Sequence, residues 1–324
     1  MDKLQNIKEP IADEFEIFKQ KFETSVQSTH PLLSEVLAYI RQRRGKMMRP
    51  MLILLIAKML GTVNESTYHA AIALELLHTA SLVHDDVVDE SDKRRGQSSV
   101  NALYDNKVSV LVGDYLLAAS LKHSALTGLL QAVELVSGLG QDLSEGEIIQ
   151  LTNTNATDFS EAVYFDVIKK KTAALFASSA EAGALSVHAE AADIENARLF
   201  GELIGIAFQI KDDLFDYADS AAIGKPTGND MKEGKLTLPA LYALNHHGDS
   251  KMKELALKIR SLEATEDEIG QFIAFVKSNQ GIEYATEVMR NYRNEALACL
   301  PPQVSLAIRT SLTQYIDYVI DRDK

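Results

Sequence analysis

The chain has 324 residues, of which 46% are hydrophobic and 24% charged, and its formal net charge is −13. This length can bury a large core, whereas the acidic balance disfavours nucleic acid, whose phosphates attract basic surfaces. The single cysteine, Cys299, excludes an internal disulfide and fits a reducing compartment. No signal peptide and no apolar stretch of membrane-spanning length is recognisable. We therefore expect a cytoplasmic protein that binds no nucleic acid and has no transmembrane segment.

Helical periodicity extends over nearly the whole chain. Prolines and glycines are few, and apolar residues recur every three or four positions. Segments 70–90, 107–125 and 197–217 are apolar on most faces, which predicts central helices, and the alanines of 173–191 favour close helix packing. No linker rich in proline, glycine and serine divides the chain. We expect one all-α domain over residues 1–324.

One acidic pattern occurs twice on these helices. Residues 85–89 read Asp-Asp-Val-Val-Asp, and residues 212–216 read Asp-Asp-Leu-Phe-Asp. Three carboxylates on one helical turn repel one another unless a cation neutralises them. A solvated acidic face is the commoner origin of a charge run, but apolar residues flank both copies here. Carboxylates suit Mg²⁺, which also binds water and substrate phosphates, so the two copies predict a Mg²⁺–polyphosphate site.

Basic residues accompany the acidic copies. Lys46 and Arg49 precede the first copy, and Arg94-Arg95-Gly96 follows it. Arginine binds phosphate bidentately and lysine as a point charge, although an ordinary solvated surface explains either pair when it is taken alone. The polar segment 218–237, which contains several lysines, follows the second copy. We expect it to be a functional loop, with a disordered connection as the alternative.

In their order, these stretches resemble the trans-isoprenyl diphosphate synthases, also called polyprenyl synthetases. The resemblance extends from about residue 30 over nearly the whole chain. The matching stretches are Gly45-Lys46-x-x-Arg49-Pro50, Glu75-x-x-His78-x-x-Ser81-Leu82-x-x-Asp85-Asp86-x-x-Asp89, Arg94-Arg95-Gly96, Gly113-Asp114, Gly146-Glu147, Lys171-Thr172, Gly205-x-x-Phe208-Gln209-x-x-Asp212-Asp213-x-x-Asp216, Gly224-Lys225, Asp230 and Gly234-Lys235. A single stretch is weakly specific, whereas the ordered set is very specific.

The resemblance implies the isoprenoid synthase fold, a helical bundle around a central cavity, and a homodimer. It also implies a prenyltransferase that condenses an allylic diphosphate with isopentenyl diphosphate and uses three Mg²⁺ ions per active site. The implied metal ligands are Asp85, Asp86, Asp89, Asp212 and Asp216, and the catalytic set adds Asp213 and Lys171. The implied ligands of isopentenyl diphosphate are Lys46, Arg49, His78 and Arg95, and those of the allylic diphosphate are Arg94, Lys171, Thr172, Gln209, Lys225 and Lys235.

Product length is expected to depend on the residues one helical turn below Asp85. Ala80 and Ser81 occupy these positions, and their small side chains would let a growing tail pass. Farnesyl-producing members of the family tend to carry a bulky aromatic residue there. We predict a product of roughly C30 to C50, with about C40 as the single best value, on this steric argument. Such a product would supply a quinone side chain. The alternative reason for two small residues is close helix packing.

Four alternatives compete with this interpretation. A shorter-chain farnesyl or geranylgeranyl diphosphate synthase would share the motifs. The His84-Asp85 pair also fits HD-type metal phosphohydrolases, but these need two more metal-binding histidines and leave the second acidic copy unexplained. A regulatory subunit without activity would have degraded aspartates, and a terpene cyclase would have a different second motif. Whether Arg322 or Lys324 reaches the site is left open by the sequence.

Overall fold

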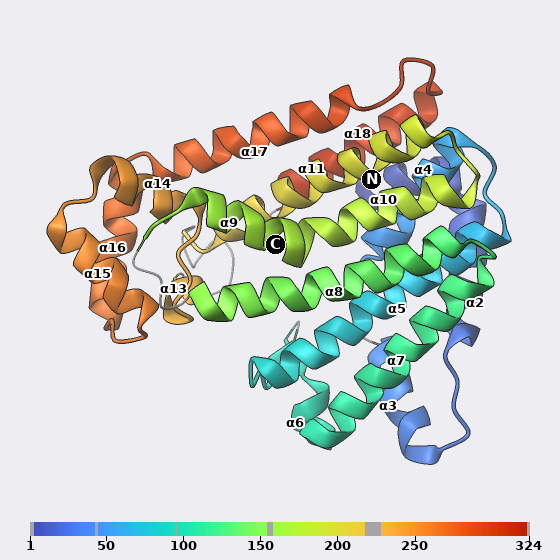
Figure 1. Cartoon of the computed structure of the whole chain (residues 1–324), viewed down its shortest axis with the longest axis horizontal. Helices are drawn as coiled ribbons and strands as arrows, with labels where there is room; N and C mark the ends of the chain where they lie inside the picture. Colours follow the sequence, from blue (N-terminus) through green and yellow to red (C-terminus); the bar gives the residue numbers. More distant parts are fainter. Residues whose placement is uncertain (1–2, 43–44, 95, 154–157, 218–227, 323–324) are drawn as a thin grey trace. The chain divides into compact units, whose positions relative to one another are not determined.

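The computed structural model describes residues 3–42, 45–94, 96–153, 158–217 and 228–322. The chain forms two compact units. Unit 1 comprises Met1–Gln141, Leu175–Gly201 and Leu300–Gln314, and unit 2 comprises Asp142–Ala174, Glu202–Cys299 and Tyr315–Lys324. Helices dominate both units (Figure 1). Among the described residues, none of the helices is long and apolar enough to span a membrane.

Unit 1 is helical apart from one small hairpin. Its elements are α1 (Lys3–Lys8), η1 (Glu9–Ile11), α2 (Ala12–Ser25), α3 (Pro31–Gln42), α4 (Met48–Leu60), α5 (Glu65–Val88), β1 (Lys93–Arg94), β2 (Gln97–Ser98), α6 (Val100–Tyr104) and α7 (Asn106–Leu126). The chain passes from one unit to the other within α8 (Leu130–Asn153), α11 (Ala191–Phe215) and α18 (Leu306–Ile320), at the start of α10 (Ala174–Ser186), and between Cys299 and Leu300.

Helix α5 is the centre of packing in unit 1. It lies beside α7 along much of its length (Figure 1) and also packs against α4 and α2. The Asn64 side chain caps its first turn, because it accepts hydrogen bonds from the backbone N–H groups of Ser66 and Thr67. Farther along, the Ser120 hydroxyl on α7 donates to the Ala73 carbonyl at 2.7 Å. These contacts fix the helix that carries the first acidic copy at its C-terminal end.

Unit 2 packs around a separate apolar cluster. Its own elements are α9 (Glu161–Ile168), a π-helical turn η2 (Lys169–Ala173), α13 (Asn229–Lys232), α14 (Leu238–His247), α15 (Ser250–Arg260), α16 (Glu266–Ser278) and α17 (Gly281–Ala298). Leu244, Ile259 and Phe272 are fully buried in the cluster. Tyr217, directly after the second acidic copy, and Met231 belong to the same cluster and are anchored in the core of this unit.

The all-α prediction is confirmed. The predicted central helices correspond to α5, α7 and α11, and the alanine-rich stretch 173–191 contains α10. The helical prediction missed the hairpin, in which Lys93 pairs with Ser98 and Arg94 with Gln97. Strands of two residues are too short to show alternation, and Gly96, with a φ of 76°, supports the tight turn. One domain over residues 1–324 stays a prediction.

The loop predicted over 218–237 is corrected over its described part. Residues 229–232 form the short helix α13, and Met231 is buried in the apolar cluster of unit 2. Gly228 precedes this helix with a φ of 78°, a conformation that suits glycine. A single methionine among polar residues gives no periodicity from which a packed turn could be predicted. Residues 218–227, including Lys225, lie outside the described residues.

Candidate active site

The first acidic copy occupies the C-terminal end of α5. Asp85 and Asp86 lie in its last turn, and Asp89 follows it as the C-terminal cap, with its N–H donating to the Asp85 carbonyl at 2.8 Å. Their exposures differ: Asp85 is half-buried, Asp86 is only 3% exposed and Asp89 is exposed. The three carboxylates therefore share a helical turn but not an environment.

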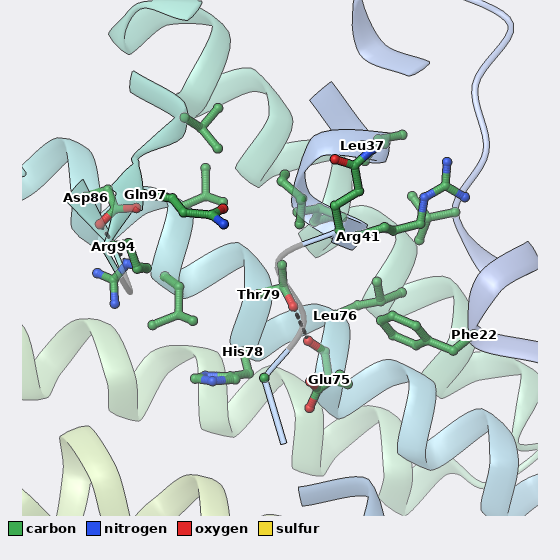
Figure 2. Close-up of a pocket in the computed structure, with 18 residues that line it drawn as sticks. Phe22, Leu37, Arg41, Glu75, Leu76, His78, Thr79, Asp86, Arg94 and Gln97 are labelled. Atoms are coloured by element: carbon green, nitrogen blue, oxygen red, sulfur yellow. Dashed lines mark hydrogen bonds and ion pairs between the residues drawn. The ribbon is translucent and has the colours of Figure 1, made fainter. Parts of the chain in front are cut away.

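Asp86 is held by the hairpin that follows α5. Its Oδ1 accepts a hydrogen bond from Nε of Arg94 at 2.7 Å, and the two side chains form an ion pair (Figure 2). The Asn101 side chain donates to the Asp86 carbonyl at 3.2 Å. The hairpin thus places an arginine beside the acidic copy, and the carboxylate fixes the direction of its guanidinium.

A cavity of about 340 Å³ opens beside these residues, within unit 1. Figure 2 shows Asp86, Arg94 and Gln97 together on one side of the cavity, and Phe22, Leu37, Arg41 and Glu75 on the other. The lining residues are Phe22, Val26, Leu37, Ile40, Arg41, Gln42, Gly45, Glu75, Leu76, His78, Thr79, Leu82, Val83, Asp86, Arg94, Gln97, Val100 and Leu116. Apolar and charged side chains both line the cavity, which can hold a small ligand.

The predicted ligands of isopentenyl diphosphate have different positions. His78 lines the cavity, as does Gly45, the residue before Lys46. Lys46 is exposed ahead of α4, and the Arg49 guanidinium in the first turn of α4 lies 5.1 Å from the centroid of the Phe176 ring. Arg95 lies outside the described residues.

The predicted product-length residues do not line this cavity. Ala80 is buried, and the Ser81 hydroxyl donates to the His78 carbonyl at 2.9 Å. On the same helix, the cavity wall is formed instead by residues such as Leu76 and Thr79. The role of Ala80 and Ser81 in product length therefore stays a prediction.

The second acidic copy ends α11, within unit 2. Its first member, Asp212, pairs with Arg322, whose guanidinium lies 2.6 Å from Oδ1 of the carboxylate. The same guanidinium donates to the Phe208 carbonyl at 3.1 Å and lies 3.8 Å from the centroid of the Phe208 ring. Arg322, whose role the sequence left open, therefore reaches the second acidic copy and supplies a cation to it.

The other two members of this copy are buried among hydrogen-bond donors. Asp213 accepts from the Tyr164 hydroxyl at 2.6 Å and from the Gln209 amide at 2.8 Å. Asp216 accepts from the backbone N–H groups of Asn229 and Asp230, at 2.7 Å and 3.1 Å. Asp213 thus connects α11 to α9, and Asp216 fixes the start of α13.

Carboxylates crowd this part of unit 2. Burial raises the pKa of Asp213 to about 8, and the charge of Asp230 adds to the rise. Burial and the neighbouring Asp216 raise the pKa of Asp230 to about 7, and burial also raises the pKa of Asp216. A divalent cation beside Asp212 would favour the ionised forms of these groups. The set of oxygen donors therefore fits a hard cation such as Mg²⁺.

The π-helical turn η2 brings two predicted ligands of the allylic diphosphate toward different helices. Lys171 forms an ion pair with Glu147 and donates to Gln150 at 3.2 Å, both on α8. The next residue, Thr172, donates to the Gln209 amide oxygen on α11 at 2.7 Å. Such π-helical insertions are frequent at functional sites, and here the turn separates two adjacent polar side chains.

Lys235 lies close to the same carboxylates. Its side chain is 2.5 Å from Oε2 of Glu233, and its backbone N–H donates to the Asp230 carbonyl at 2.7 Å. The lysine therefore remains beside the acidic group that Asp216 and Asp230 form. Lys225, which is also a predicted ligand of the allylic diphosphate, lies outside the described residues.

Sequence reasoning gave no role to several residues of these two regions. Arg41, Thr79 and Gln97 line the cavity of unit 1, and Tyr164 binds Asp213 in unit 2. Thr79, Gln97 and Tyr164 belong to no charged cluster or repeated pattern, whereas Arg41 begins the basic stretch 41–46. A second available signal was Arg322, a basic residue near the chain end, but sequence alone does not name its partner.

Carboxylates in the described part of the chain do not by themselves complete a metal site. Across residues 3–322 with the gaps given above, no group of three or more His, Cys, Asp or Glu side chains is placed to hold a metal. Mg²⁺ commonly uses one or two protein carboxylates together with water and substrate phosphates. Asp85, Asp89 and Asp212 are the members of the two copies that are not buried.

The sequence profile of the polyprenyl synthetase family matches residues 30–276. The chain belongs to this family. Octaprenyl diphosphate synthase of Haemophilus influenzae is 35% identical over 286 residues, which cover 88% of this chain and 86% of that protein. The crystal structure of a geranylgeranyl pyrophosphate synthase from Bacteroides thetaiotaomicron is 52% identical, covers 99% of this chain and 100% of its own, and has a TM-score of 0.86.

A further structure in the polyprenyl synthetase family bears on the ligands. The polyprenyl synthase of Caulobacter crescentus, described as complexed with calcium and isoprenyl diphosphate, is 30% identical. It covers 99% of this chain and 98% of its own, with a TM-score of 0.89. The predicted isoprenoid synthase fold and the predicted prenyltransferase activity are thus confirmed. The chain is a polyprenyl synthetase from a metal-dependent family, rather than an HD-type hydrolase.

Proposed function

We propose that this polyprenyl synthetase is a Mg²⁺-dependent, long-chain, all-trans polyprenyl diphosphate synthase. It would condense an allylic diphosphate with successive isopentenyl diphosphates to give a product of about C30 to C50, on the steric argument from the small residues of α5. The observation that carries the proposal is the doubled acidic copy, each at the end of a helix with a basic side chain bonded to it. We further propose a cytoplasmic homodimer whose product supplies a quinone side chain.

The metal ions would be held by the least buried aspartates. We assign Asp85, Asp89 and Asp212 as ligands of three Mg²⁺ ions, with substrate diphosphate and water completing the coordination. Mg²⁺, when bound, supplies the positive charge that stabilises a departing diphosphate. Asp86, Asp213 and Asp216 are buried and bonded to protein donors, so their contribution is to hold the surrounding groups.

The basic side chains would bind and orient the two diphosphates. Charge-assisted hydrogen bonds from arginine and lysine stabilise diphosphate in the ground state and as a leaving group. Arg94, Lys171, Thr172, Gln209, Lys225 and Lys235 are assigned to the allylic diphosphate, and Lys46, Arg49, His78 and Arg95 to isopentenyl diphosphate. The allylic C–O bond breaks, the isopentenyl double bond forms the new C–C bond, and a proton leaves. Released diphosphate can accept that proton, so no protein base is assigned.

A shorter product is the second candidate. The relative that is 52% identical is described as a geranylgeranyl pyrophosphate synthase, which favours a C20 product. Against it, the small side chains of Ala80 and Ser81 one turn below Asp85 would let a longer tail pass, and the relative from Haemophilus influenzae is described as an octaprenyl diphosphate synthase. The two candidates share the chemistry and differ in where chain growth stops.

Product sizing separates the candidates. Purified protein is incubated with Mg²⁺, labelled isopentenyl diphosphate and farnesyl diphosphate, and the dephosphorylated products are sized. Products longer than geranylgeranyl are expected; growth that stops at geranylgeranyl would select the shorter-chain candidate. A lack of incorporation with every allylic primer from dimethylallyl to geranylgeranyl diphosphate would overturn the prenyltransferase proposal.

A substitution one turn below Asp85 tests the steric argument for product length. Ala80→Phe is expected to shorten the product by several isoprene units, because the ring would block the path of the tail. Ala80→Ser, which keeps a small side chain, is the matched control and should leave the product unchanged. An unchanged product distribution in a folded Ala80→Phe protein would show that the tail does not pass this residue.

A further inference from the structure

His84 stands directly before the first acidic copy, and the proposed reaction gives it no role. Its side chain extends from α5 toward α7, which lies beside it (Figure 1). Nε2 lies 3.2 Å from the Val110 carbonyl oxygen and 3.4 Å from Oδ1 of Asp114. Both of these oxygens are acceptors, so the geometry places a hydrogen on Nε2 and makes the ring a donor to α7. The imidazole therefore links two helices.

Gly113 allows the imidazole to lie against α7. This glycine is buried, and a Cβ built on it would lie 2.1 Å from Nε2 of His84. Even an alanine at this position would therefore overlap the ring as it is placed. Val110, Gly113 and Asp114 are three and four positions apart and share one face of α7. This face offers the ring a carbonyl, a carboxylate and the space that a missing side chain leaves.

The contact reaches the last turn of α5, where a helix opens most easily. The last four carbonyl groups of a helix lack intrahelical partners, so the final turn depends on other elements to hold it. On the hairpin side, the Asp86 carbonyl accepts from the Ser91 N–H at 2.9 Å and from the Asn101 side chain at 3.2 Å. On the α7 side, the His84 ring makes the bond described above. The turn is thus held from two sides.

The rotation of this turn sets the direction of Asp85. Consecutive side chains on a helix point about 100° apart, so fixing the His84 side chain against α7 also fixes where the next side chain points. Asp85 is half-buried and is one of the proposed ligands of Mg²⁺. Because Mg²⁺ requires near-ideal octahedral geometry, a small rotation of this carboxylate would weaken the coordination.

We propose that His84 is a positioning residue of the first acidic copy. By donating to α7 across Gly113, it fixes the rotation of the last turn of α5 and so the direction in which Asp85 meets the metal. This inference rests on the proposed function, because Asp85 is a ligand only within that proposal. It adds a histidine and a glycine to the residues on which metal binding depends, although neither is assigned to touch the metal.

Metal affinity and local opening can both be measured without catalysis. The variants are His84→Ala, His84→Gln and Gly113→Ala, with Gly138→Ala on α8 as the matched control, because an added Cβ there meets no atom within 4 Å. Mn²⁺ affinity is measured by electron paramagnetic resonance in the presence of farnesyl S-thiolodiphosphate, an unreactive allylic diphosphate. Hydrogen exchange follows the amides of residues 85–89, and circular dichroism checks the fold.

The variants should separate the donor from the space that it occupies. His84→Ala is expected to weaken Mn²⁺ binding by about three- to tenfold and to speed amide exchange in the last turn by about tenfold, the net effect of one lost hydrogen bond. His84→Gln keeps an N–H donor of similar reach and should restore most of the affinity. Gly113→Ala displaces the ring and should resemble His84→Ala, whereas Gly138→Ala should match the wild type.

A double variant distinguishes positioning from a general loss of packing. In a His84→Ala background there is no ring to displace, so Gly113→Ala should cause no further loss of Mn²⁺ affinity. Equal losses from Gly113→Ala with and without the ring would overturn the proposal. Should His84→Ala fail to fold, His84→Leu fills the space without an N–H donor and should weaken Mn²⁺ by the same factor. Unchanged affinity in that variant would likewise count against the proposal.

The outcomes also separate this proposal from the proposed function. Unchanged Mn²⁺ affinity in both His84→Ala and Gly113→Ala would overturn the positioning role, while prenyl transfer would stand. Binding as weak in His84→Gln as in His84→Ala would also overturn it. If the wild-type protein binds Mn²⁺ with the thiolodiphosphate but transfers no prenyl group, the proposed function fails and the variants still decide the role of His84. A wild type that binds no Mn²⁺ would overturn both.

Discussion

In unit 1, the buried carboxylate of Asp86 is neutralised by an arginine from a hairpin that follows eight positions later. In unit 2, the buried carboxylate of Asp213 is instead bonded to a tyrosine and an amide, and its pKa rises to about 8 because of burial and the nearby Asp230. The same five-residue pattern therefore has two different electrostatic surroundings. The comparison teaches that motif spacing specifies which carboxylates are adjacent, whereas the neighbouring elements determine which partners each carboxylate meets.

The largest expected effect tests whether both acidic copies take part in the same reaction. Asp85→Ala and Asp212→Ala should each lower kcat by at least about a hundredfold, since each removes a carboxylate assigned to the charge that stabilises the leaving diphosphate. Steady-state kinetics with farnesyl and isopentenyl diphosphates measures this. Asp267→Ala, an exposed aspartate on α16, is the control and should retain activity. Near-normal activity in Asp212→Ala alone would show that the second copy is not part of the chemistry.

Two glycines extend the comparison of the two units to the packing of their helices. A side chain at Gly205 on α11 would meet the backbone of Ala173 on η2, whereas one at Gly113 on α7 would meet the end of the His84 ring on α5. Backbone cannot move aside, so Gly205→Ala should lower the free energy of unfolding by about 1–3 kcal/mol, and Gly113→Ala by less, because the imidazole can turn away. Urea unfolding measures both.

Open glycines provide the controls for these two variants. Gly138 on α8 and Gly270 on α16 have no atom within 4 Å of an added Cβ. Gly138→Ala and Gly270→Ala should therefore leave the protein unchanged or stabilise it by up to about 1 kcal/mol, the difference in helix propensity. Equal losses of unfolding free energy in Gly205→Ala and Gly113→Ala would show that the contact at Ala173 is no more restrictive than the contact at His84.

The arginine at Asp212 offers a third way to test the comparison. Arg322→Ala is expected to tighten Mn²⁺ binding by about tenfold, because it removes an intramolecular cation whose charge-assisted hydrogen bond competes with metal for the same carboxylate. Isothermal titration of the metal-free protein with Mn²⁺ measures this, with Arg290→Ala, exposed on α17, as the control. Unchanged or weaker binding would mean that Arg322 supports the site rather than competing for it.

The smallest expected effect lies far along α5 from its aspartates. Nδ1 of His69 lies 3.0 Å from Nδ1 of His123 on α7. Burial lowers the pKa of both rings, with Glu65 opposing the shift at His69 and the neighbouring His69 adding to it at His123. Lys21 faces His69 and Lys122 faces His123, and both lower the pKa, while the Ser25 carbonyl raises that of His123.

The sign of the pH dependence follows from the lowered pKa values. The unfolded chain takes up protons as the pH falls through 6.5, whereas the folded pair resists protonation, so the stabilising contribution is complete above pH 6.5 and is lost below it. The urea midpoint of the wild type should therefore fall more between pH 7.5 and pH 5.5 than that of a His69→Gln/His123→Gln variant. The two pH values lie about one unit on either side of the ordinary histidine pKa. An equal fall of the urea midpoint in the two proteins would exclude His69 and His123 as the cause of the pH dependence.

Helices and the ordered motifs could be predicted from the sequence because they depend on near neighbours. Apolar spacing gave α5, α7 and α11, and the aspartates and basic residues gave the family resemblance. The partners of the aspartates could not be predicted, because contact between distant positions leaves no periodic trace. Tyr164 and Asp213 are 49 positions apart, and Arg322 binds a carbonyl 114 positions earlier. The hairpin was missed because each strand has two residues.

In the π-helical turn η2, the number of residues matters as much as their identity. Because an α-helix turns by about 100° per residue, deleting one residue from Lys169–Ala173 to restore α-helical bonding would swing Lys171 away from Glu147 or Thr172 away from Gln209. Natural variation in this segment should therefore proceed by substitution, with insertions and deletions excluded. Alignments of polyprenyl synthetases that introduce a gap here would misplace the residues on one side of it.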